Sequence, residues 1–145
     1  MNVFKALFAN QYYELKPKGK EAAARLNGSR ILGICLAIDF ILLVVIAMVI
    51  SPDLADGFSD LIKDIFGRRQ GRTVAKVVVL IPFLIFLPLV NYTLGSETGY
   101  GKIIKEFESL SADQQAKVSK KGLVFAIVSF ANMFVATALA LIFFA

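Results

Sequence analysis

The sequence contains no histidine and only one cysteine, Cys35. The absence of histidine excludes bis-histidine haem ligation, histidine proton shuttles and most zinc sites. A single cysteine excludes an intrachain disulfide and a cysteine-cluster metal site. Cys35 lies in an apolar stretch, where a thiol is hard to ionise, so we interpret it as a small packing residue. The sequence therefore offers no catalytic residue, no metal site and no cofactor site.

Charge is also scarce. Of the 145 residues, 19% are charged and 57% are hydrophobic, whereas a soluble domain of this size needs far more polar surface. The charged residues cluster between three long apolar runs, which is typical of a polytopic helical membrane protein. The formal net charge is +5. In this context we expect Lys and Arg to meet anionic lipid headgroups, and we expect no nucleic-acid partner.

Three apolar runs are long enough to cross a bilayer as helices, at residues 31–50, 74–94 and 122–145. A helix rises about 1.5 Å per residue and the hydrocarbon core is about 30 Å thick. The second run contains Pro82 and Pro88. Each proline removes a backbone donor and clashes with the preceding turn, so a kink or local unwinding is expected there.

Short amphipathic segments are predicted at residues 1–28, 52–67 and 102–110, which gives an all-α integral membrane protein with three transmembrane helices and interfacial helices. We interpret the first segment either as lying on the membrane surface or as packing on another protein of the same complex. Asn27-Gly28 is predicted to end a short helix, with Ser29 capping the next one.

The later helix boundaries are also marked by local signals. Ser51-Pro52 predicts the start of the helix at 52–67, and Gly67 predicts the end of this helix. Residues 95–101 are predicted to be a loop. Ser111 and Gln114 have the spacing of a capping box, so a new helix is expected to start there and can run unbroken into the third span.

Asp39 lies near the centre of the first span. Burying a carboxylate at this depth costs free energy, so such a residue usually has a structural or functional role. Small residues allow two membrane helices to pack closely along a seam, and both the first and the third span contain them. In the first span they are Gly33 and Ala37. If the first and third spans pack through such residues, the Asp39 carboxylate is expected to meet Ser129 or Asn132, which lie at similar depth. In the third span the small residues of the seam are Gly122, Ala126, Ser129, Ala136 and Ala140.

The distribution of positive charge predicts the orientation. Residues 1–30 contain six Lys and Arg and residues 96–121 contain five, against four in residues 51–73. By the positive-inside rule the N-terminus is expected in the cytoplasm and the C-terminus outside, although Arg68, Arg69 and Arg72 oppose this. A bacterial inner membrane is the expected location.

Two kinds of function fit this pattern. The first is a non-catalytic accessory or assembly subunit of a larger membrane complex, because amphipathic segments and a small-residue seam provide docking surfaces for other subunits and for lipid. The second is a homo-oligomeric channel or a proton- or cation-coupled transport protein that uses Asp39. A holin-like protein is a third alternative for a three-span chain. An enzyme is not expected.

Overall fold

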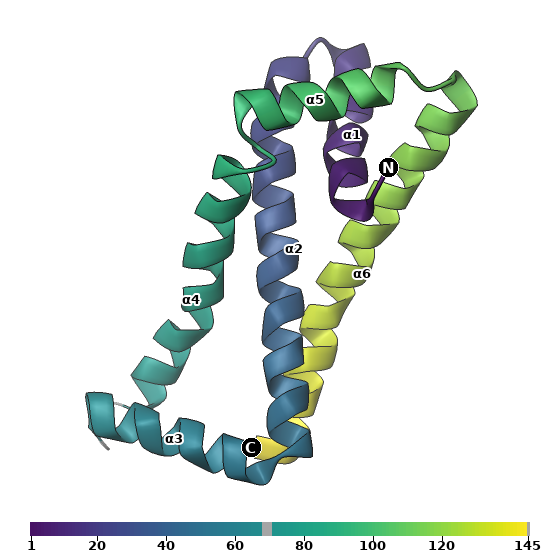
Figure 1. Cartoon of the computed structure of the whole chain (residues 1–145). Helices are drawn as coiled ribbons and strands as arrows, with labels where there is room; N and C mark the ends of the chain where they lie inside the picture. The colour runs from purple at the N-terminus through teal and green to yellow at the C-terminus, as the bar shows by residue number, and fades with distance from the viewer. Residues whose placement is uncertain (68–70, 145) are drawn as a thin grey trace.

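The computed structural model describes residues 1–67 and 71–144, except for the side chains of residues 71–77. Of three long helices, the first two are connected by a short helix at one end of the molecule, and the last two by a short helix at the other end (Figure 1). An N-terminal helix packs at this second end. No strand occurs among the described residues. The elements are α1 (Val3–Leu15), the 3-10 turn η1 (Lys16–Lys18), α2 (Glu21–Ile50), α3 (Pro52–Phe66), α4 (Gly71–Tyr92), α5 (Glu97–Glu108) and α6 (Ala112–Phe144).

Helix α2 is the centre of the arrangement, because both α4 and α6 pack against it (Figure 1). Within the described residues, α2 and α6 are each long and apolar enough to cross a membrane. A third candidate consists of Val78–Tyr92 of α4 together with α5, which are bent by 69° at their junction. The chain is thus all-helical, with two or three helices able to span a bilayer.

One side of helix α1 is buried against other helices of the chain. It lies against α2, α5 and α6, and its Leu7 and Phe8 side chains are fully buried. This helix thus covers the chain's own core, which neither predicted alternative included. Its position at the membrane surface stays a prediction. The core cluster consists of Leu7, Phe8, Leu32, Cys35, Val90, Ile103 and Ala126.

Helix α2 continues through the position where a helix end was predicted. Gly28 is an interior residue of α2, and Ser29 is not a cap. A Cβ atom on Gly28 would lie 2.6 Å from Cδ1 of Phe8, so this glycine allows α1 to approach α2 closely. A glycine is therefore needed at position 28, but it is needed for close packing of two helices and not for a helix end.

Helix α3 has the boundaries that its flanking residues predicted. Pro52 is its first residue, and Gly67 ends it with a φ of 78°. Ser51 occupies the cap position but makes no side-chain capping hydrogen bond. No residue of α3 is buried, so both its apolar and its acidic sides are open to the surroundings. Arg68 and Arg69, the side chain of Arg72, and Ala145 lie outside the described residues.

Helix α4 runs through Pro82 and Pro88 as one continuous helix, so there is no local unwinding at these prolines, and the alternative of a kink stays a prediction. The predicted loop at 95–101 is also largely helical. Helix α5 begins at Glu97 because Ser96 caps it, with the Gly99 N–H donating to Ser96 Oγ at 3.1 Å.

Helix α6 starts at the predicted capping box. The Ser111 N–H donates to Oε1 of Gln114 at 3.2 Å, and the Gln114 N–H donates to Oγ of Ser111 at 3.4 Å. From there α6 continues unbroken for 33 residues. Its first part packs on α1 and its later part on α2.

Candidate functional site between helices α2 and α6

The Asp39 carboxylate of α2 is held by two side chains of α6. Ser129 Oγ donates a hydrogen bond to Oδ2 at 2.8 Å, and Asn132 Nδ2 donates to Oδ1 at 2.8 Å. Both carboxylate oxygens thus accept a hydrogen bond from the same neighbouring helix. The contact expected from the shared depth of these residues is present in the structure, with both candidate partners rather than one.

The geometry of α6 explains why both partners reach the same carboxylate. Ser129 and Asn132 are three residues apart, so they lie on the same side of the helix, one turn from each other. Ser129 is almost fully buried, at 1% exposure, whereas Asp39 and Asn132 are half-buried. Ala37, two residues before Asp39, is fully buried. Hence the serine bond is enclosed, while the asparagine bond lies nearer the surface of the helix pair.

The small residues of the predicted seam do not all face the same neighbouring helix. A Cβ atom on Gly33 would lie 2.9 Å from a methyl carbon of Leu87, so Gly33 faces α4. A Cβ atom on Gly122 would lie 2.2 Å from the backbone oxygen of Ala6, so Gly122 faces α1. The expectation that both glycines join α2 to α6 was wrong, because small residues mark a close approach without naming the partner helix. Ala126 and Ala136 are buried, and Ala140 is half-buried.

An apolar cavity of about 440 Å³ adjoins the polar cluster. Ile38 and Met133, which line it, are sequence neighbours of Asp39 and Asn132. The hydroxyl of Thr137 is the polar side-chain group in the lining, and it donates to the Met133 carbonyl at 2.8 Å. The cavity therefore offers no continuous series of polar groups leading from the cluster. The lining residues are Ile38, Ile41, Val45, Val79, Phe83, Met133, Ala136, Thr137, Ala140 and Leu141.

A second buried polar contact was missed by sequence reasoning. Asn10 of α1 donates from Nδ2 to Ser119 Oγ of α6 at 2.9 Å, and both side chains are buried. A signal was available, because Ser119 lies one turn before Gly122 and extends the same small-residue stripe. Together, the Asn10 and Asp39 contacts place buried polar hydrogen bonds along two parts of α6.

Charged contacts join α1 to α5 at the polar end. Lys5 pairs with Glu106 at 2.8 Å, and Lys16 pairs with Glu108 at 2.9 Å. Tyr12 also donates from its hydroxyl to Glu108 at 2.5 Å. The hydrogen bond from Lys16 lowers the pKa of Glu108, and that from Lys5 lowers the pKa of Glu106. Burial, followed by the bond to Glu108, raises the pKa of Tyr12.

Within residues 1–67 and 71–144 there is no group of three or more His, Cys, Asp or Glu residues that could hold a metal ion. No family model, curated protein or solved structure matches this chain. Inferences about function therefore depend on the residues and contacts described above. Chemically, the Asp39 cluster can join two helices through hydrogen bonds.

Proposed function

We propose that this chain is a three-span membrane protein that serves as a non-catalytic accessory or assembly subunit of a larger membrane complex. The observation that carries the proposal is the apolar surface left open along all three long helices. In a bilayer these side chains would face lipid or the helices of other subunits. Large apolar side chains that are more than half exposed on these helices include Leu43, Ile50, Leu84, Ile85, Phe134 and Ile142.

The internal polar contacts support a structural role. The Asp39 carboxylate has a hydrogen-bond donor at each oxygen, and both donors belong to a helix of the same chain. The neighbouring cavity is lined almost entirely by apolar side chains. A transport path needs polar groups in series, whereas one satisfied cluster needs only to join two helices.

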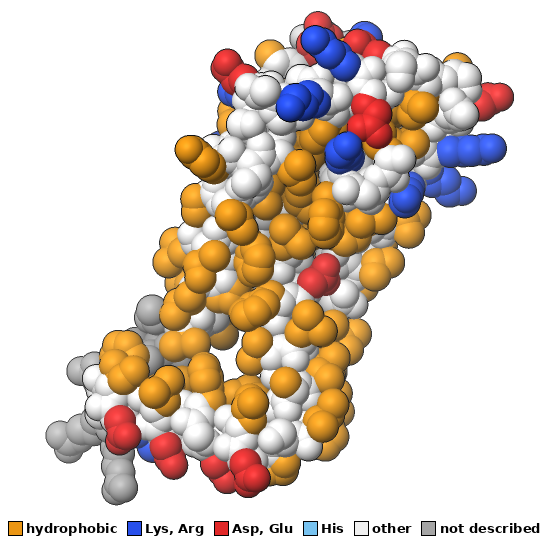
Figure 2. Space-filling model, viewed as in Figure 1, with side chains coloured by type: hydrophobic (Ala, Val, Ile, Leu, Met, Phe, Trp, Pro, Cys, Tyr) orange, Lys and Arg blue, Asp and Glu red, His pale blue; other side chains and the backbone are white. Residues whose placement is uncertain are grey.

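The distribution of charge supports the proposed topology. The two basic segments, 1–30 and 96–121, lie at the same end of the molecule, and α3 lies at the other end (Figure 1). Lys and Arg side chains gather at the first end, where acidic side chains lie among them, and acidic side chains gather on α3 (Figure 2). By the positive-inside rule the end with α1 and α5 would face the cytoplasm. In this topology α2, α4 and α6 span the bilayer, and α3 lies at the opposite interface.

The native mass of the gently extracted protein tests the proposal. The chain would be extracted into lipid nanodiscs from its own membrane, and every co-purifying protein would be identified and quantified. An accessory subunit is expected to emerge with other membrane proteins in fixed stoichiometry. A chain that emerges alone, as a monomer or a symmetric homo-oligomer, would contradict the proposal.

One observation favours a second function, a homo-oligomeric channel or a proton- or cation-coupled transport protein. Asp39 and Asn132 are half-buried rather than enclosed, so part of the cluster is open to a further helix or to a second copy of the chain. In a symmetric oligomer the carboxylate would be repeated around an axis. This function predicts cation or proton flux in liposomes that Asp39→Asn abolishes, and unchanged flux in the variant would rule it out.

A further inference from the structure

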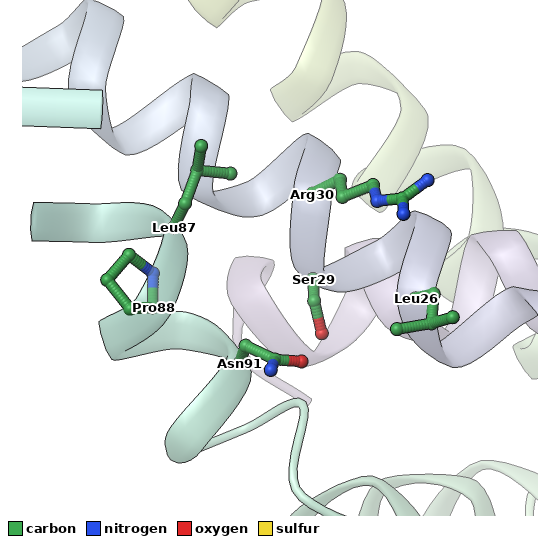
Figure 3. A pocket seen from close by; sticks show the side chains of 6 residues that line it. All are labelled: Leu26, Ser29, Arg30, Leu87, Pro88 and Asn91. Carbon is green, nitrogen blue, oxygen red and sulfur yellow. The ribbon is translucent and has the colours of Figure 1, made fainter. Parts of the chain in front are cut away.

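A second pocket lies between α2 and α4 at the polar end of the molecule. It has a volume of about 350 Å³ (Figure 3). It is separate from the apolar cavity beside Asp39, and the two pockets share no lining residue. The lining residues are Leu26, Ser29, Arg30, Leu87, Pro88 and Asn91.

The Ser29 hydroxyl is buried in this region without a hydrogen-bond partner. Ser29 is 3% exposed, and its Oγ atom has no partner among the described residues. Figure 3 shows the Ser29 hydroxyl and the Asn91 side chain pointing toward one another from α2 and α4. Gly95 leaves the space for this hydroxyl, since a Cβ there would lie 1.9 Å from Oγ. Buried polar groups are normally satisfied, so an unpaired hydroxyl beside a pocket points to a ligand.

Arg30 adds a positive charge to the same pocket. Arg30 lines the pocket and its side chain is exposed. In Figure 3 its guanidinium points away from Pro88 and Asn91, and an exposed side chain is free to turn. Among the described residues no carboxylate forms an ion pair with it, whereas Arg25 on the previous turn of α2 pairs with Glu97. A guanidinium without a carboxylate partner is well suited to a phosphate group, which it can bind through two parallel hydrogen bonds.

The position of the pocket along the helices suggests where such a phosphate would come from. Ser29 and Arg30 directly precede the apolar run that begins at Ile31, and Asn91 lies near the end of the apolar run of α4. Leu87 and Pro88 line the part of the pocket nearer that apolar run. The pocket therefore combines hydrogen-bond donors and a cation at headgroup depth with an apolar surface nearer the centre of the helices.

We propose that this pocket binds the phosphate of an anionic membrane lipid. The exposed Arg30 side chain would turn toward Asn91 and neutralise the phosphate, while the Asn91 amide donates a hydrogen bond to the headgroup. A small shift of the Asn91 side chain would open the buried Ser29 hydroxyl for a second hydrogen bond. The first part of an acyl chain would lie along Leu87 and Pro88. This site is independent of the accessory role, because a lipid bound between α2 and α4 would hold these two helices together in either proposed function.

The binding of defined lipids to the purified full-length protein tests this site. Native mass spectrometry would measure the apparent affinity of the first bound phosphatidylglycerol and of the first bound phosphatidylcholine. The wild-type protein is expected to prefer phosphatidylglycerol. Arg30→Gln is expected to weaken phosphatidylglycerol binding about tenfold, the factor for loss of one hydrogen bond between charged groups. Asn91→Leu is expected to weaken it without a change in charge.

Lys18→Gln is the matched control, because Lys18 is an exposed cation at the same end that does not line the pocket. If Lys18→Gln weakens binding as much as Arg30→Gln, the attraction is diffuse and the site is wrong. Equal affinity for the two lipids also overturns it. Displacement of phosphatidylglycerol by inorganic phosphate would show that the pocket takes free phosphate rather than lipid. Should Arg30→Gln fail to fold, as judged by elution and helix content, Asn91→Leu still decides the question.

Discussion

A carboxylate in the middle of an apolar helix must be protonated, paired or hydrogen-bonded, because a bare charge in hydrocarbon is very unfavourable. Asp39 is hydrogen-bonded at both oxygens. The two donors belong to α6, so the same contacts that satisfy the carboxylate also fix the position of α6 along α2. At the scale of single residues, this cluster links the burial of polar groups to the register of two helices.

Asparagine at position 39 should preserve much of this link. Its amide can accept from Asn132 and donate to Ser129, so Asp39→Asn is expected to cost less than about 1 kcal/mol, near the average for an interhelical hydrogen bond in a membrane. Asp39→Leu leaves Ser129 and Asn132 without their acceptor, and is expected to cost about 1–3 kcal/mol. Reversible unfolding in bicelles measures both free energies.

Comparing Asp39→Leu with Asp39→Asn therefore distinguishes two roles of the carboxylate. If the role is structural, only the leucine variant loses much stability, whereas if the charge is needed, both variants do. An equal loss of stability in the two variants would contradict the structural interpretation of Asp39. A variant of a more exposed residue of the same helix, Leu43→Ala, serves as the control for general sensitivity of α2 to substitution.

At the scale of helices, boundaries set by local chemistry were predictable from the sequence. The start of α3 at Pro52 and the start of α6 after Ser111 depend on residues within one turn of the boundary. Glycines were not predictable in the same way. Asn27-Gly28 has the pattern of a helix end, but Gly28 instead leaves space for the ring of Phe8, which lies twenty residues away in the sequence.

The partner of each small residue was also beyond sequence reasoning. The contact between Asp39 and Asn132 could be predicted because a polar group at that depth needs a polar partner, and few were available. Gly33 and Gly122 have no such requirement. Any helix can approach a glycine, so only the packed structure assigns Gly33 to α4 and Gly122 to α1.

A methyl group at Gly122 should separate α1 from α6. The new Cβ would meet the Ala6 backbone, which cannot rotate away as a side chain can. Gly122→Ala is therefore expected to cost about 1–3 kcal/mol, the usual range for overpacking. Gly57→Ala is the matched control, because a Cβ there meets nothing within 4 Å, and it should be neutral or slightly stabilising. Equal stability of the two variants would show that α1 does not pack this closely.

The contact between α1 and α5 should weaken in acid. The pKa of Glu108 in the folded chain is lowered from its ordinary value of 4.5, chiefly by the hydrogen bond from Lys16. The contribution of this contact is therefore complete above about pH 4.5 and is lost as the pH falls through the lowered value. The exposed position of the pair keeps the effect small.

Hydrogen exchange of the α5 amides between pH 3 and pH 6, corrected for the intrinsic pH dependence of exchange, measures this effect. Wild-type α5 is expected to lose protection toward the acidic end of that range. In Glu108→Gln the remaining pH dependence should be smaller. An identical pH dependence in the variant and the wild type would show that this carboxylate does not hold α5 on α1.

At the scale of the whole molecule, the two ends differ in construction. One end is a packed cluster of α1, α5 and the polar ends of the long helices, joined by ion pairs and by the core around Phe8. The other end is covered by α3, which buries none of its residues. In the proposed topology the compact basic end faces the cytoplasm, and the apolar sides of the long helices are left for lipid and for other subunits.

The sidedness of single cysteines tests this topology most directly. In a Cys35→Ala background, Lys18→Cys, Asp60→Cys and Lys117→Cys would each be exposed to a membrane-impermeant maleimide on right-side-out vesicles. We predict that only the cysteine at position 60 is labelled before the vesicles are broken, and that all three are labelled afterwards. Labelling of positions 18 and 60 from the same side would show that α2 does not cross the membrane, and labelling of 60 and 117 from the same side would show the same for α4.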